Sequence, residues 1–124
     1  MPVKKTAALH GTYTMYCRFT EDKVPSQVDW EQTFVCLNHK IIKFNNLKFT
    51  FKVWPSRHIT TKNFRYEGDP IMTYTQHVYL EFDCECPRDT LREDFPEDET
   101  DFKDEIQKHL IGWKVLTLGL GDLA

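Results

Sequence analysis

Two cysteines and a histidine lie close together in one stretch of the chain, and these residue types can bind a metal. Cys84 and Cys86 are separated by one residue, and His77 precedes them. Zinc sites usually combine a Cys-x₂₋₄-Cys pair with a second matched pair, whereas Cys17 and Cys36 each stand alone. The spacing therefore predicts no metal site and no cofactor. Because no signal peptide is recognisable, we interpret the four cysteines as free thiols and expect an intracellular, cytoplasmic, reducing location.

Motifs for nucleophilic catalysis and phosphate binding are absent from the sequence. There is no Gly-x-Ser-x-Gly motif, and the glycines Gly119 and Gly121 are not followed by a helix that could bind phosphate. We therefore predict no catalytic residues and do not expect an enzyme.

The run Gln76–Phe82, QHVYLEF, resembles the metal-binding strand of viral rolling-circle replication initiators. Those nucleases place two histidines, separated by one residue, on a central strand. Here Thr75 occupies the position of the first histidine, and the segment from Thr100 to Leu110 lacks the tyrosine that the family carries on a later helix. The resemblance implies a metal-dependent nuclease, with His77 as a ligand, as the third of three functional alternatives.

Charge is distributed unevenly along the chain, although the net charge is only −3. All charged residues between Gln32 and Tyr66 are basic: Lys40, Lys43, Lys48, Lys52, Arg57, Lys62 and Arg65. Between Glu81 and Glu105 there are twelve acidic residues and three basic ones. Two poles of opposite charge bear on association with other molecules rather than on the fold.

Aromatic residues are interleaved with the basic ones, which suggests a binding face. The candidate residues for binding an anionic partner are Lys43, Lys48, Lys52, Trp54, Arg57, Lys62, Phe64, Arg65 and Tyr66. The candidate acidic interaction segment comprises Asp94, Glu97, Asp98, Glu99, Asp101, Asp104 and Glu105. Solvated surfaces of a globular domain can show the same composition, so composition alone does not establish a binding site.

Three functions remain open, and two of them use the basic face. We expect a small non-enzymatic binding and assembly protein whose acidic segment contacts a second protein or another copy of the chain, giving a homo-oligomer. The alternative is a single-stranded nucleic-acid-binding protein, in which aromatic rings stack on bases and cations contact phosphates. No stretch approaches the ~20 apolar residues of a transmembrane helix, so no membrane span is predicted.

A long alternating stretch from Met72 to Cys86 is expected to organise the fold. Its side chains alternate between apolar and polar types, interrupted at Gln76, as in a half-buried strand. Asn45-Asn46 should form a hairpin turn, because asparagine tolerates positive φ. That turn pairs Phe44 with Leu47 and sets Lys43 opposite Lys48.

The remaining elements complete a mainly β domain. Further strands are expected at Gly11–Phe19, Val28–Leu37 and His58–Tyr66, and a helix at Thr100–Leu110. Lys114–Leu120 is interpreted as a last strand or as a tail. We predict a single domain over residues 1–124, with a flexible tail at 1–10 and an acidic loop at 87–99. The fold class is an antiparallel sheet, bent or folded as a sandwich, of about six to seven strands with one C-terminal helix; the alternative is an α+β ferredoxin-like fold.

Overall fold

The protein is built around one long strand that pairs with three others. The computed structural model describes residues 6–20, 26, 32–38, 40–55, 60–66 and 69–124. Strand β5 (Asp69–Pro87) pairs antiparallel with β1 (Thr6–Phe19) along one edge, and with β3 (Leu47–Pro55) and β4 (Thr60–Tyr66) along the other. In its second half the expected alternation holds, because Val78, Leu80 and Phe82 are buried whereas Tyr79 and Glu81 are exposed.

The predicted hairpin is confirmed. Strand β2 (Ile41–Phe44) pairs with β3 through the register Lys43↔Lys48 and Phe44↔Leu47. Asn45, in the turn, has a φ of 54°, which is the left-handed conformation that asparagine adopts more readily than most residues.

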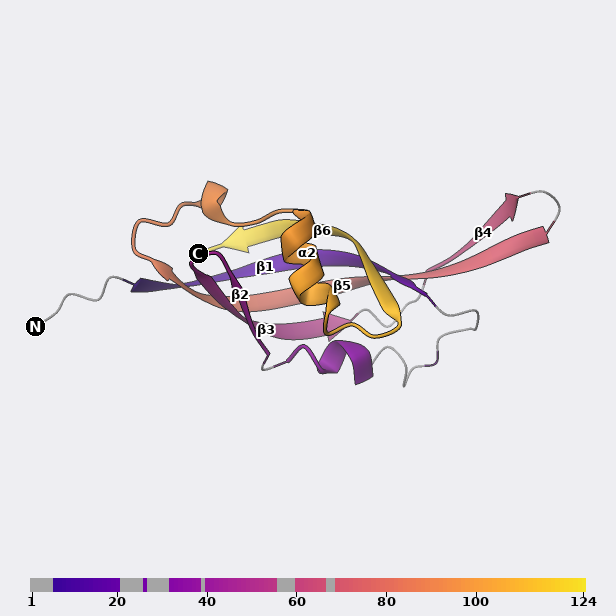
Figure 1. The fold of residues 1–124 in the computed structure, drawn as a ribbon, viewed down its shortest axis with the longest axis horizontal. Helices are drawn as coiled ribbons and strands as arrows, with labels where there is room; N and C mark the ends of the chain where they lie inside the picture. The colour runs from indigo at the N-terminus through magenta and orange to yellow at the C-terminus, as the bar shows by residue number, and fades with distance from the viewer. Residues whose placement is uncertain (1–5, 21–25, 27–31, 39, 56–59, 67–68) are drawn as a thin grey trace, which may run out of the picture.

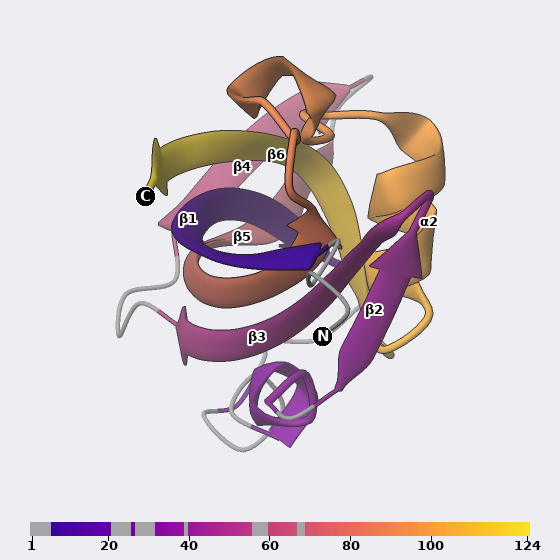
Figure 2. The same cartoon turned by 90° about the vertical axis from the view of Figure 1, so that its left-hand side faces the viewer.

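One curled sheet and one short helix enclose the core. The five-strand path runs β2-β3-β5-β1-β6, where β6 is Trp113–Leu123, and β4 pairs beside it with β5. Helix α2 (Thr100–Gln107) contacts β2 and β6, the two ends of this path, and so closes the concave side of the sheet (Figure 2). The mainly β, antiparallel class with a C-terminal helix is confirmed. The described strands form one sheet rather than a sandwich, and α2 follows β5 rather than an early strand as a ferredoxin-like fold requires.

Aromatic rings fill the space between the sheet and α2. Tyr13 packs within 5.1 Å of Phe82 and 5.6 Å of Phe102, measured between ring centroids. Trp113, at the start of β6, lies 4.9 Å from the ring of Phe19. Phe102 and Ile106 of α2 are fully buried, as the predicted helical stripe requires.

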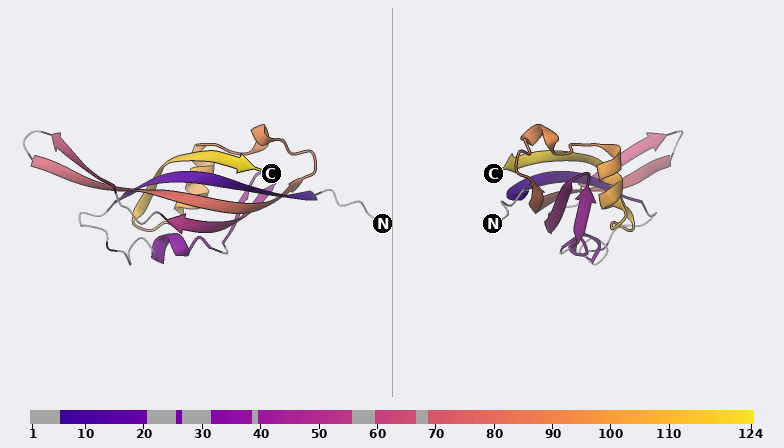
Figure 3. Two further views of the ribbon diagram at one scale, coloured as in Figure 1. Left: turned by 180° about the vertical axis from the view of Figure 1, so that it is seen from behind. Right: turned by 60° about the vertical axis from the view of Figure 1, so that its left-hand side comes forward.

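Strand β4 and the first part of β5 project from the body as a two-stranded arm. Figures 1 and 3 show this arm extending away from α2 and the rest of the sheet. The backbone register pairs Phe64 with Ile71 and Tyr66 with Asp69. The expected strand at His58–Tyr66 is thus confirmed from Thr60 onward, and residues 56–59 lie outside the described part.

The strand expected at Val28–Leu37 is wrong for the residues that the structure describes. Gln32–Val35 form a helical turn, and residues 36–38 are a further turn. Phe34 and Leu37, three positions apart, are both buried, and Phe34 lies 5.2 Å from the ring of Trp113. The i, i+3 spacing of a helix therefore places both side chains in the core.

The expected tail needs correction, whereas the expected acidic loop is present and ordered. Thr6–His10 belong to β1 and pair with β5 from Thr6↔Pro87 to His10↔Asp83, so the predicted tail at 1–10 does not include them. The acidic loop at 87–99 contains a short 3₁₀ helix, η1 (Arg92–Asp94), and packs against the core. Phe95 and Pro96 are buried, and the hydroxyl of Tyr13 donates a 2.9 Å hydrogen bond to the Pro96 carbonyl.

The crossing of β1 over Phe82 predicts a strict requirement for glycine at position 11. A Cβ atom at Gly11 would lie 2.5 Å from Phe82 Cζ and 2.6 Å from the Asp122 carbonyl oxygen. We expect Gly11→Ala to reduce the free energy of unfolding by about 1–3 kcal/mol, because the backbone oxygen cannot move aside locally. Urea denaturation measures this. The control is Gly119→Ala, whose Cβ would meet no atom within 4 Å; equal loss in both variants would contradict the explanation.

Candidate interaction surface

The convex side of the sheet is the candidate functional surface, which we call the open face. It carries the exposed residues of β3 and β5, and the outward residues of β1. Cross-strand pairing places Lys48 opposite Glu85, Thr50 opposite Asp83, Lys52 opposite Glu81 and Trp54 opposite Tyr79. On the other side of β5, His10 is opposite Asp83 and Thr14 is opposite Tyr79. Helix α2 lies on the far side of the sheet (Figure 2).

Opposite charges form two adjacent rows on the open face. The basic row is Lys48 and Lys52 of β3, and the acidic row is Glu81, Asp83 and Glu85 of β5. Neighbouring strands are about 4.8 Å apart, so residues far apart in sequence become direct neighbours. The sequence predicted two separate poles; the register instead brings the basic hairpin against the acidic end of β5.

An aromatic pair lies at the end of the two rows. Trp54 is 50% exposed and Tyr79, directly opposite, is 43% exposed. The Lys52 ammonium lies 4.5 Å from the centre of the Trp54 ring, in cation–π range. Farther along β5, His77 stacks against Tyr16 of β1 with ring centroids 4.6 Å apart. These are large side chains that a partner can cover.

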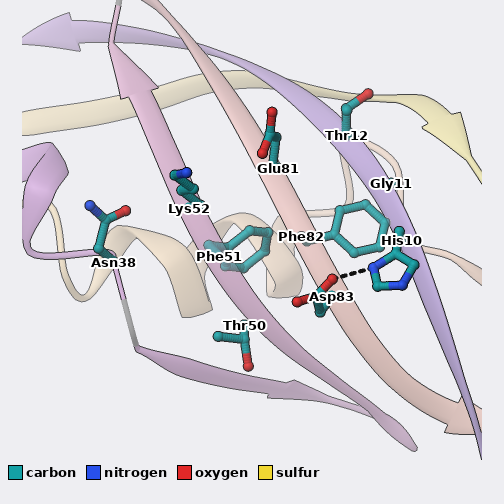
Figure 4. A pocket seen from close by; sticks show the side chains of 10 residues that line it. All are labelled: His10, Gly11, Thr12, Asn38, Thr50, Phe51, Lys52, Glu81, Phe82 and Asp83. Carbon is teal, nitrogen blue, oxygen red and sulfur yellow. Dashed lines mark hydrogen bonds and ion pairs between the residues drawn. The ribbon is translucent and has the colours of Figure 1, made fainter.

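Hollows lie on both sides of Tyr79. One, of about 480 Å³, is lined by side chains that include Thr50, Lys52, Glu81, Asp83 and His10. Figure 4 shows His10 and Asp83 pointing toward each other across the neighbouring strands, joined by a hydrogen bond. The other hollow, of about 390 Å³, is lined in part by Thr14, Tyr16, His77 and Thr117.

Two polar side chains that line the first hollow have partners within the sheet. Thr12, the hydroxyl nearest along β1 to His10, accepts a 2.9 Å hydrogen bond from the Asp122 amide. The Thr12 hydroxyl therefore has a partner on β6, and His10 is paired with Asp83. Charged side chains of both signs remain available for recognition.

The predicted basic and aromatic residues are only partly brought together. Lys48, Lys52 and Trp54 share the open face, and Lys43 extends it onto β2 opposite Lys48. Arg57 lies outside the described residues. Lys62, Phe64, Arg65 and Tyr66 lie on β4, in the arm. The arm therefore separates these four residues along the chain from the strand β3 that carries Lys48, Lys52 and Trp54.

Part of the predicted acidic segment covers the free edge of β6. Glu97 Oε1 accepts a hydrogen bond from the Leu120 amide at 3.2 Å, and Asp98 Oδ1 accepts one from the Leu118 amide at 3.1 Å. The Asp98 amide donates to the Leu118 carbonyl at 2.8 Å. Edge strands left open can recruit other strands, and these contacts block that route.

The other acidic residues of the segment have varied positions. Asp94 accepts a hydrogen bond from the Leu91 amide, and Glu105 forms an ion pair with Lys108. Glu99 is the N-cap residue of α2. Asp101 and Asp104 lie exposed on that helix.

Sequence reasoning missed Gln107 as a structural residue. Its Oε1 accepts a 2.7 Å hydrogen bond from the Val115 amide, and its Nε2 donates to the Trp113 carbonyl. Lys103 Nζ donates to the Leu116 carbonyl at 3.4 Å, and Arg92 donates to the Leu120 carbonyl at 3.4 Å. Side chains from residues 92–107 thus bond the β6 edge along most of its length. A glutamine on a short helix gives no sequence signal for this role.

Three of the four free cysteines, Cys17, Cys84 and Cys86, are buried among apolar residues, whereas Cys36 is exposed. Cys84 and Cys86 are about 1% exposed on the concave face, whereas His77 lies on the open face of the same strand. Burial raises the pKa of Cys84 to about 12 and that of Cys17 to about 12, which keeps both thiols protonated. No set of three or more His, Cys, Asp or Glu residues gathers into a possible metal site among the described residues.

Thr75, the position that the nuclease resemblance would fill with histidine, is 4% exposed. Strand β5 therefore buries Thr75 and places His77 on the face opposite to Cys84 and Cys86.

Comparison with known proteins adds no assignment: no family model matches the chain, and neither the curated proteins nor the solved structures contain a match. Among the described residues no helix has the length and apolar character needed to cross a membrane.

The hydrogen bonds of the Gln107 side chain are expected to contribute to the free energy of unfolding. We expect Gln107→Ala to reduce the free energy of unfolding by about 1–3 kcal/mol, because the Val115 amide and Trp113 carbonyl lose their partner. Amide hydrogen exchange at Val115 should accelerate. The control is Lys108→Ala on the same helix, whose exposed ion pair should change stability by less than about 1 kcal/mol. Unchanged exchange at Val115 in Gln107→Ala would contradict this role.

The Asp98 contacts predict a pH dependence. The hydrogen bond from Lys103, at 3.0 Å, and that from the Leu118 amide hold the pKa of Asp98 below its ordinary value of 3.8. The stabilisation is therefore present above pH 3.8 and is lost as pH falls through the lower pKa of the folded state. Urea midpoints of the wild type and Asp98→Asn should differ by a constant amount at neutral pH and converge at acidic pH. A difference independent of pH would contradict the ion pair.

Proposed function

We propose that this protein is a small non-enzymatic binding and assembly protein whose open face contacts another protein. The observation that carries the proposal is the exposed pair Trp54 and Tyr79, set beside rows of opposite charge on a sheet face that α2 leaves uncovered. Aromatic residues are enriched among those that dominate binding energy at protein interfaces. The charge rows supply orientation, since complementary charges select partners more than they raise affinity.

The basic hairpin keeps its role in this proposal, but the partner surface must present both charges. Lys48 and Lys52 each have a carboxylate directly opposite, so the positive potential over β3 is cancelled within about one strand spacing. A partner of a single charge would meet repulsion from one row. Glu97 and Asp98 are better explained as cover for the β6 edge than as contacts to a second protein.

Single-stranded nucleic acid is the alternative, because Trp54, Tyr79, Tyr16 and His77 present rings on one sheet face. Such binders combine stacking rings with a positively charged groove. The carboxylates of the acidic row lie beside these rings and would repel phosphates, which favours a protein partner.

A photo-crosslinking residue on the open face tests the proposal. With p-benzoylphenylalanine in place of Tyr79, irradiation in a cell extract should give adducts that are sensitive to protease and resistant to nuclease. Adding Trp54→Ala should remove them, since loss of a central aromatic residue commonly weakens binding by ~30-fold or more. The control places the crosslinker at Ile111, which is 86% exposed in the loop after α2. Nuclease-sensitive adducts, or equal yields at both positions, would overturn it.

A further inference from the structure

We propose that the partner is a second copy of this chain, bound face to face through a two-fold axis that runs parallel to the strands between β3 and β5. This inference rests on the proposed function, because it assigns the partner of the same open face. Its basis is the pairing of side chains across these two strands, because each exposed residue of β3 from Lys48 to Trp54 has a chemically complementary residue directly opposite on β5.

The symmetry follows from the register. Rotation about a two-fold axis between β3 and β5 places the partner's β5 over β3 and the partner's β3 over β5. The rotation does not move residues along the strand direction. Each residue of β3 then faces the partner residue that corresponds to its own neighbour on β5. Two-fold interfaces use the same patch on both copies, so the patch must complement itself under this exchange. Sheets packed in this way keep their strands within about 30° of each other, as in natural sandwiches.

The basic and acidic rows complement themselves under this rotation at two positions along the strands. Lys48 is opposite Glu85 within one chain, so it would face the partner's Glu85 across the interface. Lys52 would likewise face the partner's Glu81, and each contact occurs twice by symmetry. An axis that is parallel to the strands but shifted sideways by one strand would not bring these lysines opposite these carboxylates.

The aromatic pair satisfies it as well. Trp54 is opposite Tyr79, so the axis places Trp54 on the partner's Tyr79 and Tyr79 on the partner's Trp54. Rings packed in this way would cover two side chains that are now half exposed. Aromatic pairs contribute beyond the area that they bury.

The β6 edge argues against assembly by strand addition at that side of the sheet. Its amides at Val115, Leu118 and Leu120 already bond to side chains of Gln107, Asp98 and Glu97. Head-to-tail contact between the basic hairpin and the acidic segment is disfavoured for the same reason, because Glu97 and Asp98 are engaged within the chain. A closed pair through the open face leaves these contacts intact.

Charge reversal in two separate chains tests the geometry. Lys52→Glu sets two carboxylates against each other at both symmetric contacts, and Glu81→Lys sets two ammonium groups together. Each purified variant should weaken dimerisation by at least ~100-fold, since juxtaposed like charges cost several kcal/mol. An equimolar mixture should give a heterodimer, because each Lys52→Glu chain then meets a Glu81→Lys chain with opposite charges. Native mass spectrometry resolves the species.

Two further variants separate this geometry from local effects. The double variant Lys52→Glu/Glu81→Lys should dimerise like the wild type. Lys43→Glu makes the same charge change on the same face, but Lys43 would face the partner's Ala8, so its dimer should persist. Circular dichroism of each variant confirms that it is folded.

The results distinguish failure of the two-fold dimer from failure of the proposed binding function of the open face. A wild-type chain that stays monomeric at ~100 μM, well above the range of specific interfaces, overturns self-association. Singly reversed variants that stay dimeric, or that do not combine on mixing, overturn the two-fold geometry. If the crosslinker at position 79 then captures a different protein, the open face keeps its proposed function while its partner is not a second copy. If it captures neither, the proposed function fails too.

Discussion

The alternation of side chains along β5, combined with the register that β3 takes against it, determines most of the structure. The even-numbered residues from Val78 to Cys86 build the core under α2, and the odd-numbered residues from His77 to Glu85 build the open face. Because the side-chain period is two, a shift of one residue would exchange these faces. Gly11 helps to fix this arrangement, since the chain approaches Phe82 too closely there for any larger residue. The register of β5 therefore determines both which residues form the core and which residues form the open face.

Local features of this fold could be predicted from sequence, and non-local ones could not. The hairpin at Asn45 and the helix that carries Phe102 and Ile106 depend on neighbouring residues, and both are confirmed. At residues 32–35 the structure has a helical turn where the sequence predicts a strand. Phe34 and Leu37 lie within a continuous apolar run, and such a run fits a buried strand as well as a helix. The adjacency of Lys52 and Glu81 depends on which strands pair and in what register. Sequence composition alone suggested distant poles, and only the strand pairing shows that these charges lie side by side.

The β6 edge of the sheet is covered by side chains of the same chain, whereas the open face is not. Side chains from residues 92–107 bond the backbone of β6, so this edge does not present a continuous row of free donors and acceptors. Tyr13 holds the same segment from inside the core through the Pro96 carbonyl. The acidic residues that composition marked as an interaction segment therefore include structural ones. In the proposed function, binding uses the open face instead, where Trp54 and Tyr79 are half exposed.

The position of β1 has a consequence for how the chain folds. This first strand lies between β5 and β6, and its partners are far away in sequence: Thr6 pairs with Pro87 and Gly11 with Leu123. Contacts of such high sequence separation slow folding, because long loops must close before they gain any stability. During synthesis, the apolar side of β1, with Tyr13, Met15 and Cys17, emerges long before either partner strand exists. β1 therefore cannot complete its sheet pairing until both β5 and β6 have left the ribosome.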